Sequence, residues 1–313
     1  MQDVFLILIG LTGLWLGTEL VIKGAVNIAE YYKLSQVFVG LAILSIGTDL
    51  PEIVIAINAA LHSAIGNTDT SGIIIGNAIG SSFSQISLVL GSAGLLGYLT
   101  LKKRHLFEDG IMLLGSVILV ILLSFDGKIT RIDGIVLVVV YLIYYFRLFH
   151  QERISKKIKK KLTKNIRKDI IYLFVGIIIV IFTSELVVDN SINFAEKFHI
   201  RQSFVGIIIL GLGTSLPELA LALNAVRKKA GGLSVGNLIG SNIFDMLIPI
   251  GMGASISELK IEKKLLLFDL PFLLALSFIV LFFFYKKKGL QKTEAVILIS
   301  IFVLYASLKI SGV

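Results

Sequence analysis

The amino-acid sequence predicts an all-α polytopic membrane protein in which ten transmembrane helices form two inverted repeats of five helices each. Three observations support this fold class. The 313 residues are 56% hydrophobic and only 16% charged, with a mean hydropathy of +0.90, which lies outside the range of soluble domains. Apolar runs of about 20 residues, long enough to cross a bilayer as a helix, recur along the chain. The two halves of the chain also resemble each other in sequence.

The apolar runs define each expected span in chain order. They cover residues 4–26, 37–61, 72–97, 106–124, 132–149, 170–194, 204–226, 233–256, 265–285 and 291–309. Continuously apolar stretches such as 171–181 argue against a β-barrel, whose strands alternate in polarity. No basic segment precedes the first run, so we expect it to be a retained helix rather than a cleaved signal. The chain has no cysteine, which excludes disulfides and thiolate chemistry.

The basic residues are distributed unevenly across the expected topology. With ten spans, 22 of the 30 Lys and Arg residues fall on one side of the membrane. The positive-inside rule makes that side cytoplasmic, so both termini are expected outside a cell membrane. The net charge of +9 is therefore read as a topology signal and not as a nucleic-acid-binding surface. The lipid bilayer is the expected partner, and no obligatory protein partner is evident.

The densest basic run, at residues 153–161, lies in the middle of the chain. It predicts a cytoplasmic linker at 151–168 between a first five-helix repeat at 1–150 and a second at 169–313. Residues 19–52 match residues 185–218 at 17 of 34 positions without a gap. Because each half holds an odd number of helices, the second half must enter the membrane from the opposite side. Inverted repeats with interrupted helices are typical of secondary transporters that bind substrate near the bilayer midplane.

Each half carries acids and a proline inside an apolar stretch. The segment GTDLPE at 47–52 returns as GTSLPE at 213–218, and GNAIGS at 76–81 returns as GNLIGS at 236–241. Ionisable groups at bilayer depth are costly and mark ion or substrate pathways. The prolines lack an N–H and so free backbone carbonyls, which can ligate a cation. A spacing of four residues places two side chains on one helix face, and it relates Thr48 to Glu52, Thr214 to Glu218, Ser81 to Gln85 and Ser241 to Asp245.

These side chains offer oxygen ligands with no nitrogen or sulfur ligand among them. Such a set favours calcium over transition metals, and magnesium is less suited because it dehydrates reluctantly. Several carboxylates close together repel one another, and sodium ions or protons could relieve that repulsion.

The two motifs resemble those of the cation/calcium exchanger superfamily, whose repeats carry G-T-S-L-P-E followed by G-N-x-x-G-S-N-I-x-D. The resemblance extends over all ten spans and is most specific at residues 213–218 and 236–245, which fit without exception. The chain looks most like the prokaryotic sodium/calcium exchangers.

The resemblance implies a function and a ligand set. It implies secondary active exchange of calcium for sodium by alternating access, with helices 2, 3, 7 and 8 broken around a midplane ion site and the first and sixth helices sliding across the other eight. It implies no enzyme activity and no cofactor. Calcium would be held by the side chains of Glu52 and Glu218 and the carbonyls of Thr48 and Thr214. Sodium would be held by the carbonyls of Ser45 and Gly211, the hydroxyls of Ser81, Ser215 and Ser241, and the side chain of Asp245.

The first repeat departs from the family pattern at three positions. Asp49 stands where serine is usual, Gln85 where asparagine or aspartate is usual, and Ser45 where alanine is frequent. Asp49 adds a carboxylate beside Glu52, which could tighten cation binding, change the number of sodium ions coupled or take up a proton. We therefore count Asp49 and Gln85 among the candidate cation ligands and leave the counter-ion open.

Other functions remain open at this point. A calcium/proton antiporter would use the same acids, and a potassium-coupled exchanger is a further variant. An ion channel does not need inverted, interrupted helices. An intramembrane aspartyl protease would need two facing aspartates, for which Asp49 and Asp245 are the candidates, but their neighbours are suited to ion ligation.

Overall fold

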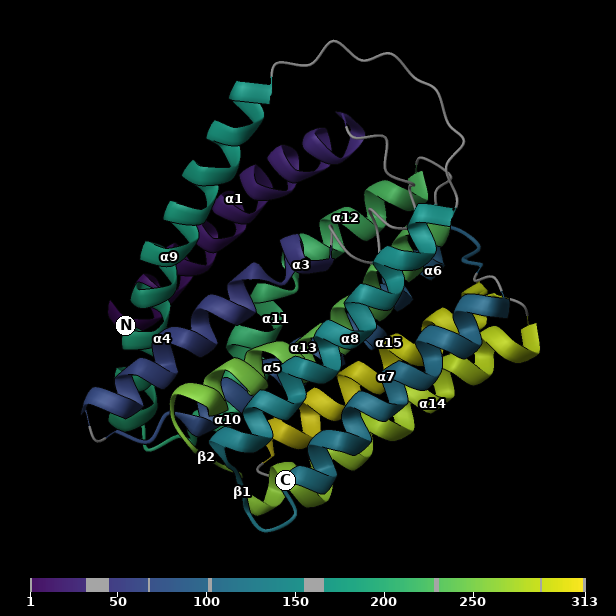
Figure 1. The fold of residues 1–313 in the computed structure, drawn as a ribbon. Coiled ribbons are helices and arrows are strands. Elements are labelled where there is room, and N and C mark those ends of the chain that lie inside the picture. Colours follow the sequence, from purple (N-terminus) through teal and green to yellow (C-terminus); the bar gives the residue numbers. More distant parts are fainter. Residues whose placement is uncertain are drawn as a thin grey trace.

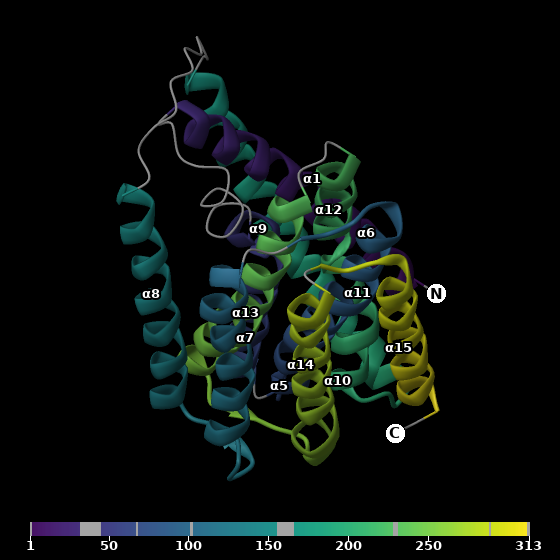
Figure 2. The same cartoon turned by 90° about the vertical axis from the view of Figure 1, so that its right-hand side faces the viewer.

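The computed structural model describes residues 2–31, 45–66, 68–100, 103–154, 166–227, 231–287 and 289–311. The described chain is helical apart from two short strands (Figures 1 and 2). In the first half the helices are α1 (Gln2–Tyr31), α3 (Ser45–Thr48), α4 (Leu50–Gly66), α5 (Ser71–Ser84), α6 (Leu90–Leu96), α7 (Lys103–Leu123) and α8 (Arg131–Ile154), with a π-helical segment η2 (Gln85–Val89) joining α5 to α6.

The second half repeats this order. Its helices are α9 (Ile166–Lys197), α10 (Gln202–Phe204), α11 (Gly211–Thr214), α12 (Leu216–Arg227), α13 (Gly231–Ile256), α14 (Leu270–Lys287) and α15 (Lys292–Ile310), with π-helical segments η3 (Val205–Leu210) and η4 (Leu265–Asp269). The strands β1 (Lys128–Ile129) and β2 (Leu259–Lys260) pair antiparallel, with Lys128 opposite Lys260. They link the α7–α8 connection to the α13–α14 connection.

The described residues contain nine helical segments long and apolar enough to cross a membrane. The remaining expected span, 37–61, is represented by α3 and the 17-residue helix α4, and its first part, 37–44, lies outside the described residues. The direction of α9 requires the described part of this span, α3 and α4, to cross as well. Asp3 at the start of α1 forms an ion pair of 3.3 Å with Lys197 at the end of α9, so the two helices are antiparallel. An even number of crossings must separate them, and α5–α6, α7 and α8 supply only three.

Helices α1 and α9 pack against each other along their length, to one side of the other helices (Figure 1). They touch at small residues: a Cβ atom added to Gly176 would lie 2.6 Å from the carbonyl oxygen of Gly17. Such close backbone contact is how membrane helices associate without a hydrophobic driving force. Since α1 and α9 are the first helices of the two halves, their antiparallel direction is the relationship that an inverted repeat requires.

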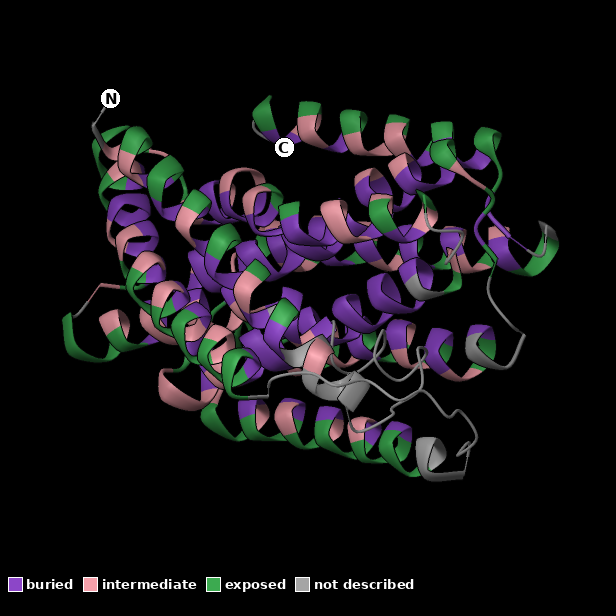
Figure 3. Ribbon diagram, turned by 90° about the horizontal axis from the view of Figure 1, so that it is seen from above, coloured by how far each residue is buried: buried purple, intermediate pink, exposed green. Residues whose placement is uncertain are grey.

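The centre of the molecule is formed by the α5–α6 helix and by α13. In the most apolar stretch of each of these two helices, 94% and 83% of the residues are buried, whereas in α9 only 22% are buried. Figure 3 shows the same division, with buried residues in the middle and exposed ones on the outer helices. Helix α5 can lie directly on η3 because Gly80 has no side chain: an added Cβ atom would overlap the backbone of Ile207. A Cβ atom added to Gly211 would likewise meet the backbone of Gly80, so the repeated segments of both halves meet in the interior.

The structure corrects the expectation that four helices are broken. The second and seventh helices are interrupted, at Asp49 and at Ser215. The third contains the π-helical segment η2 but no break, and the eighth is the uninterrupted helix α13, so the predicted break in the eighth helix is wrong. The motif at residues 236–245 contains no proline of its own, and α13 continues through Pro249 although that residue cannot donate to the Asp245 carbonyl. The predicted linker at 151–168 lies mostly outside the described residues, since 155–165 are not described.

Candidate cation site

Two interrupted helices approach the centre of the molecule. In the first half the chain leaves α3 at Thr48, turns at Asp49 and resumes as α4, and in the second half it turns at Ser215 between α11 and α12. Pro51 and Pro217 have no N–H, so neither can donate to the carbonyl four residues before it, at Gly47 and Gly213. Each break therefore exposes backbone oxygens beside an acid.

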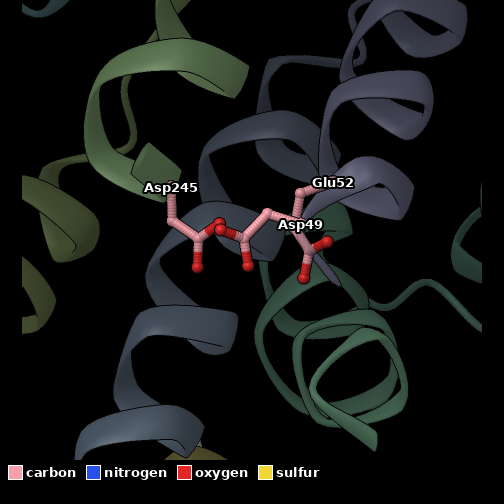
Figure 4. Close-up of side chains that lie close together, drawn as sticks. All are labelled: Asp49, Glu52 and Asp245. Atoms are coloured by element: carbon pink, nitrogen blue, oxygen red, sulfur yellow. The ribbon is translucent and has the colours of Figure 1, made fainter. Parts of the chain in front are cut away.

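Three carboxylates converge at the first break (Figure 4). Asp49 and Glu52 come from the interrupted second helix and Asp245 from α13, and one carboxylate oxygen of each lies within 4.8 Å of the others. All three side chains are 0% exposed. Three buried carboxylates at this separation form a group that could hold a metal ion.

The fourth acid, Glu218 at the start of α12, is also 0% exposed. It is not one of the three mutually closest acids. The Glu218 carboxylate nevertheless lies close enough to the Glu52 carboxylate to interact with it electrostatically. The Asp49 carboxylate interacts in the same way with the other three acids, Asp245, Glu218 and Glu52. The four acids therefore form one buried cluster of negative charge.

Ser81 and Gln85 of the third helix hydrogen-bond part of this cluster. Ser81 Oγ donates to Glu52 Oε1 at 2.7 Å and lies 3.2 Å from Ser215 Oγ. Gln85 Nε2 donates to Ser81 Oγ and to Asp245 Oδ2, both at 3.1 Å. These bonds position one oxygen of Glu52 and one of Asp245.

Seven other polar atoms of the cluster have no hydrogen-bond partner among the residues that the structure describes. They are both carboxylate oxygens of Asp49 and of Glu218, Glu52 Oε2, Asp245 Oδ1 and Ser241 Oγ. Buried carboxylates without partners are strongly unfavourable unless a cation compensates them. The donor set is made of carboxylates, hydroxyls and carbonyls, which suits a hard cation such as calcium or sodium. The residues present therefore fit a cation site.

The carbonyls expected to bind sodium lie in the same region. The carbonyl of Ser45 accepts a hydrogen bond from Thr48 Oγ1 at 3.2 Å, and that of Gly211 accepts one from Ser215 Oγ at 2.7 Å. Thr214 is buried and its hydroxyl lies 3.4 Å from Asn77 Oδ1. The Ser45 carbonyl also accepts the backbone N–H of Asp49 at 2.9 Å, so a cation there would have to compete with these hydrogen bonds. All the candidate ligands predicted from the sequence thus lie in the buried centre.

Three buried asparagines in the centre, Asn77, Asn237 and Asn242, were not predicted to have a role. Asn242 Nδ2 donates to Gln85 Oε1 at 2.9 Å and so orients the amide that contacts Asp245. Asn77 Oδ1 accepts a hydrogen bond from the Thr214 hydroxyl. Neither polar atom of the counterpart Asn237 side chain has a hydrogen-bond partner among the described residues. The repeated Gly-Asn dipeptides at 76–77 and 236–237 were a usable signal, since an amide within an apolar span needs a partner.

The sequence of the chain is similar to those of known proteins. Both halves match the family model described as sodium/calcium exchanger protein, over residues 3–149 and 168–311. The chain is 27% identical to the sodium/calcium exchanger MaX1 of Methanosarcina acetivorans, over 96% of each chain. It is 30% identical to the inner membrane protein YrbG of Escherichia coli, over 88% of this chain and 86% of the other.

A solved structure has the same fold. The sodium-calcium exchanger NCX_Mj, soaked with Na+ and Sr2+, is 28% identical and superposes with a TM-score of 0.71, covering 100% of this chain and 99% of the other. The similarity extends over the whole chain, including both interrupted helices.

Proposed function

Because the chain belongs to the sodium/calcium exchanger protein family, we propose that it is a secondary active antiporter that exchanges calcium for sodium across the membrane by alternating access. It is a multi-pass membrane protein of a family of transporters rather than enzymes. The choice of sodium and calcium as the exchanged ions is supported by the similarity to MaX1 and NCX_Mj, which are both called sodium/calcium exchangers.

The observation that carries the proposal is the buried cluster of carboxylates with unpaired oxygens. Calcium takes six to eight oxygen ligands. Glu52 and Glu218 would hold it, together with the backbone carbonyls of Thr48 and Thr214. Sodium ions would use the carbonyls of Ser45 and Gly211, the hydroxyls of Ser81, Ser215 and Ser241, and the carboxylate of Asp245. Asp49 and Gln85 would be further ligands, specific to this chain's first repeat.

Alternating access would be provided by the α1–α9 pair. These two helices pack chiefly on each other and contact the remaining helices over a smaller surface, which suits movement as a unit. Asn58 of α4 donates to Ser184 of α9 at 2.5 Å, and His62 of α4 lies 3.0 Å from Asp189 of α9. These two polar contacts are local, so they can be broken as the pair slides.

The orientation in the membrane also remains a proposal. The excess of Lys and Arg on one side favours both termini outside and the 151–168 linker in the cytoplasm. Cysteine substitutions at Asp126 and at Lys160, labelled with an impermeant reagent in intact cells, would test it. Labelling of Asp126→Cys alone is expected, and labelling of Lys160→Cys would reverse the orientation.

A calcium/proton antiporter is the second candidate, because Asp49 supplies one acid more than the family motif carries. Calcium uptake into proteoliposomes separates the two functions when an outward sodium gradient and an outward proton gradient are compared at matched membrane potential. We expect radioactive calcium to accumulate with the sodium gradient. Accumulation driven only by the proton gradient would replace the proposed function with the second candidate.

A further inference from the structure

A pocket away from the cation site lies between the ends of three helices. Its walls come from the start of α10, the residues just before η4 and the last residues of α15 (Figure 2). Its volume is about 440 Å³, within the range of about 300–1,000 Å³ that is usual for ligand pockets. None of the candidate cation ligands lines it.

The pocket lies at the level where apolar helices end. The membrane-crossing segments that contribute to it are Gln202–Arg227, Leu265–Lys286 and Lys292–Ile310, and the pocket residues lie at one end of each. The ends of membrane helices meet the lipid headgroups. A molecule in this pocket would therefore touch both the headgroup layer and the edge of the apolar core.

The charged side chains of the pocket are mainly cationic. Arg201, Lys264 and Lys309 line it, and Glu262 is the one acid among the lining residues. Asp269 lies behind Lys309, with Oδ2 at 2.9 Å from the Lys309 Nζ atom. The lining residues and this partner together carry one more positive than negative charge. An anion in the pocket would balance it.

The cations and a serine can still donate hydrogen bonds to a ligand. The Lys309 ammonium group has three N–H donors, of which Asp269 accepts one. Arg201 lies 3.8 Å from Glu262, which is too long for a hydrogen bond. Ser203 lines the pocket and forms no side-chain hydrogen bond with the described residues. Guanidinium, ammonium and hydroxyl donors around one pocket suit the oxygens of a phosphate group.

Apolar side chains form the rest of the lining. They belong to Ile200, Phe204 and Ile310, and Ile310 is 71% exposed. A free anion would gain nothing from these side chains, whereas a lipid has glycerol and acyl groups to place against them. The combination of cationic and apolar lining therefore favours an amphiphile.

We propose that this pocket binds the headgroup of an anionic phospholipid, with the phosphate held by Arg201, Lys264 and Lys309. The glycerol and acyl groups would lie against Phe204 and Ile310. Glu262 accepts hydrogen bonds, so a headgroup with hydroxyl groups, such as that of phosphatidylglycerol, suits the site. Phosphatidylcholine has the same phosphate, but its quaternary ammonium would be repelled by the three cations.

A lipid bound here would connect helices that support the cation site. Helix α10 continues through η3 and α11 to the interruption at Ser215. It also packs on the third helix, since a Cβ atom added to Gly76 would lie 2.6 Å from the carbonyl oxygen of Ser203. The lipid would hold the start of the seventh helix to α14 and α15, and it should stabilise the folded protein.

Native mass spectrometry of the purified protein tests the binding. The protein in detergent is titrated with dioleoylphosphatidylglycerol or with dioleoylphosphatidylcholine. We expect the first phosphatidylglycerol molecule to bind about tenfold or more tightly than the first phosphatidylcholine, because each basic residue strengthens the attraction to an anionic headgroup. The double variant Arg201→Gln, Lys264→Gln should lose most of this preference. It keeps Lys309, whose ion pair with Asp269 is buried.

The matched control is the double variant Lys128→Gln, Lys197→Gln. Both residues are exposed and ion-paired, and they lie outside the pocket. They are at the same end of the molecule, since Lys128 is opposite Lys260 in the strand pair and Lys197 ends α9 just before the pocket residues. This variant loses the same charge and should keep the preference. An equal loss in both double variants would overturn the inference, and so would a wild type that binds the two lipids equally, whether or not the variants fold.

Thermal unfolding distinguishes a lipid from a free anion. Phosphatidylglycerol should raise the unfolding midpoint of the wild type and of the control variant, but not that of the pocket variant. Inorganic phosphate at the same concentration should leave the wild-type midpoint unchanged, because it has no apolar groups to bury. An equal rise with inorganic phosphate would contradict a lipid ligand. None of these readouts depends on transport, so their failure would leave the proposed function intact.

Discussion

Gln85 and Asp245 occupy corresponding positions in the two halves, and they contact each other directly: Gln85 Nε2 donates to Asp245 Oδ2 at 3.1 Å. The same amide donates to Ser81 and accepts from Asn242. The glutamine side chain is one methylene longer than asparagine, and its amide bridges the third and eighth helices. One side-chain amide thus connects the two repeats at the cation site.

Removing this amide should destabilise the protein. In Gln85→Met the volume is nearly kept, but Asp245 Oδ2 and Asn242 Nδ2 lose a partner, and each unsatisfied buried group costs about 1–3 kcal/mol. We expect a lower thermal unfolding midpoint in detergent without calcium. The matched control is Ser87→Ala in the same helix, since the Ser87 hydroxyl bonds only to the Phe83 carbonyl. Equal midpoints for the two variants would remove the structural role assigned to Gln85.

Neutralising either central glutamate should abolish calcium transport while the protein still folds. Glu52→Gln and Glu218→Gln keep the shape of each side chain but remove a charge that would bind calcium. Sodium-driven calcium uptake into proteoliposomes should fall to the level of empty vesicles, with an unchanged elution profile in size-exclusion chromatography. Glu258→Gln, at an exposed ion pair with Lys128, should transport normally. Uptake retained by both site variants would show that these acids do not carry the cation.

Calcium should stabilise the folded protein. A ligand that binds only the folded state, at 100 times its Kd, adds about 2.7 kcal/mol to the free energy of unfolding. The thermal midpoint should therefore rise when calcium replaces a chelator, and added sodium should reduce the rise by competition. Glu52→Gln should lose the effect and Glu258→Gln should keep it. An equal effect of magnesium would mean that the site does not select calcium in the way its ligands suggest.

A buried ion pair away from the cation site should matter for stability. Lys309 of α15 contacts Asp269 Oδ2 at 2.9 Å, and Tyr305 donates to the other oxygen of the same carboxylate at 2.6 Å. Lys309→Met leaves Asp269 charged and buried, which should cost about 3–5 kcal/mol.

The double variant Lys309→Met, Asp269→Asn removes both charges and should recover much of this loss in thermal unfolding experiments. The exposed pair of Lys128 and Glu258 is the control, because removing an exposed pair costs about 0–1 kcal/mol. A loss no larger for Lys309→Met than for Lys128→Met would contradict the assigned role.

Much of the fold follows from the sequence because its determinants are local. Apolar runs are set by bilayer thickness, and the interruptions at Asp49 and Ser215 follow from prolines that cannot donate a hydrogen bond. The repeat predicted which helices correspond. It did not reveal that α13 is uninterrupted, because the motif there signals close packing through glycine and is compatible with a continuous helix.

The sequence yields candidate residues for the site but not the contacts between them. Sequence spacing placed Ser81 and Gln85 on one helix face, and the structure brings both onto acids from other helices. The bond between Gln85 and Asp245 depends on how two helices from different halves approach each other, which no local pattern encodes. The contrast between the paired Ser81 and the unpaired Ser241 likewise arises only from tertiary structure.

The most direct test of the central claim is anomalous diffraction from crystals of the protein soaked with calcium or strontium. We expect a single strong anomalous peak among the carboxylates of Asp49, Glu52, Glu218 and Asp245, and its loss in crystals of Glu52→Gln. A peak elsewhere in the molecule, or none in the wild type at saturating ion, would contradict the assignment of these buried acids as the calcium site.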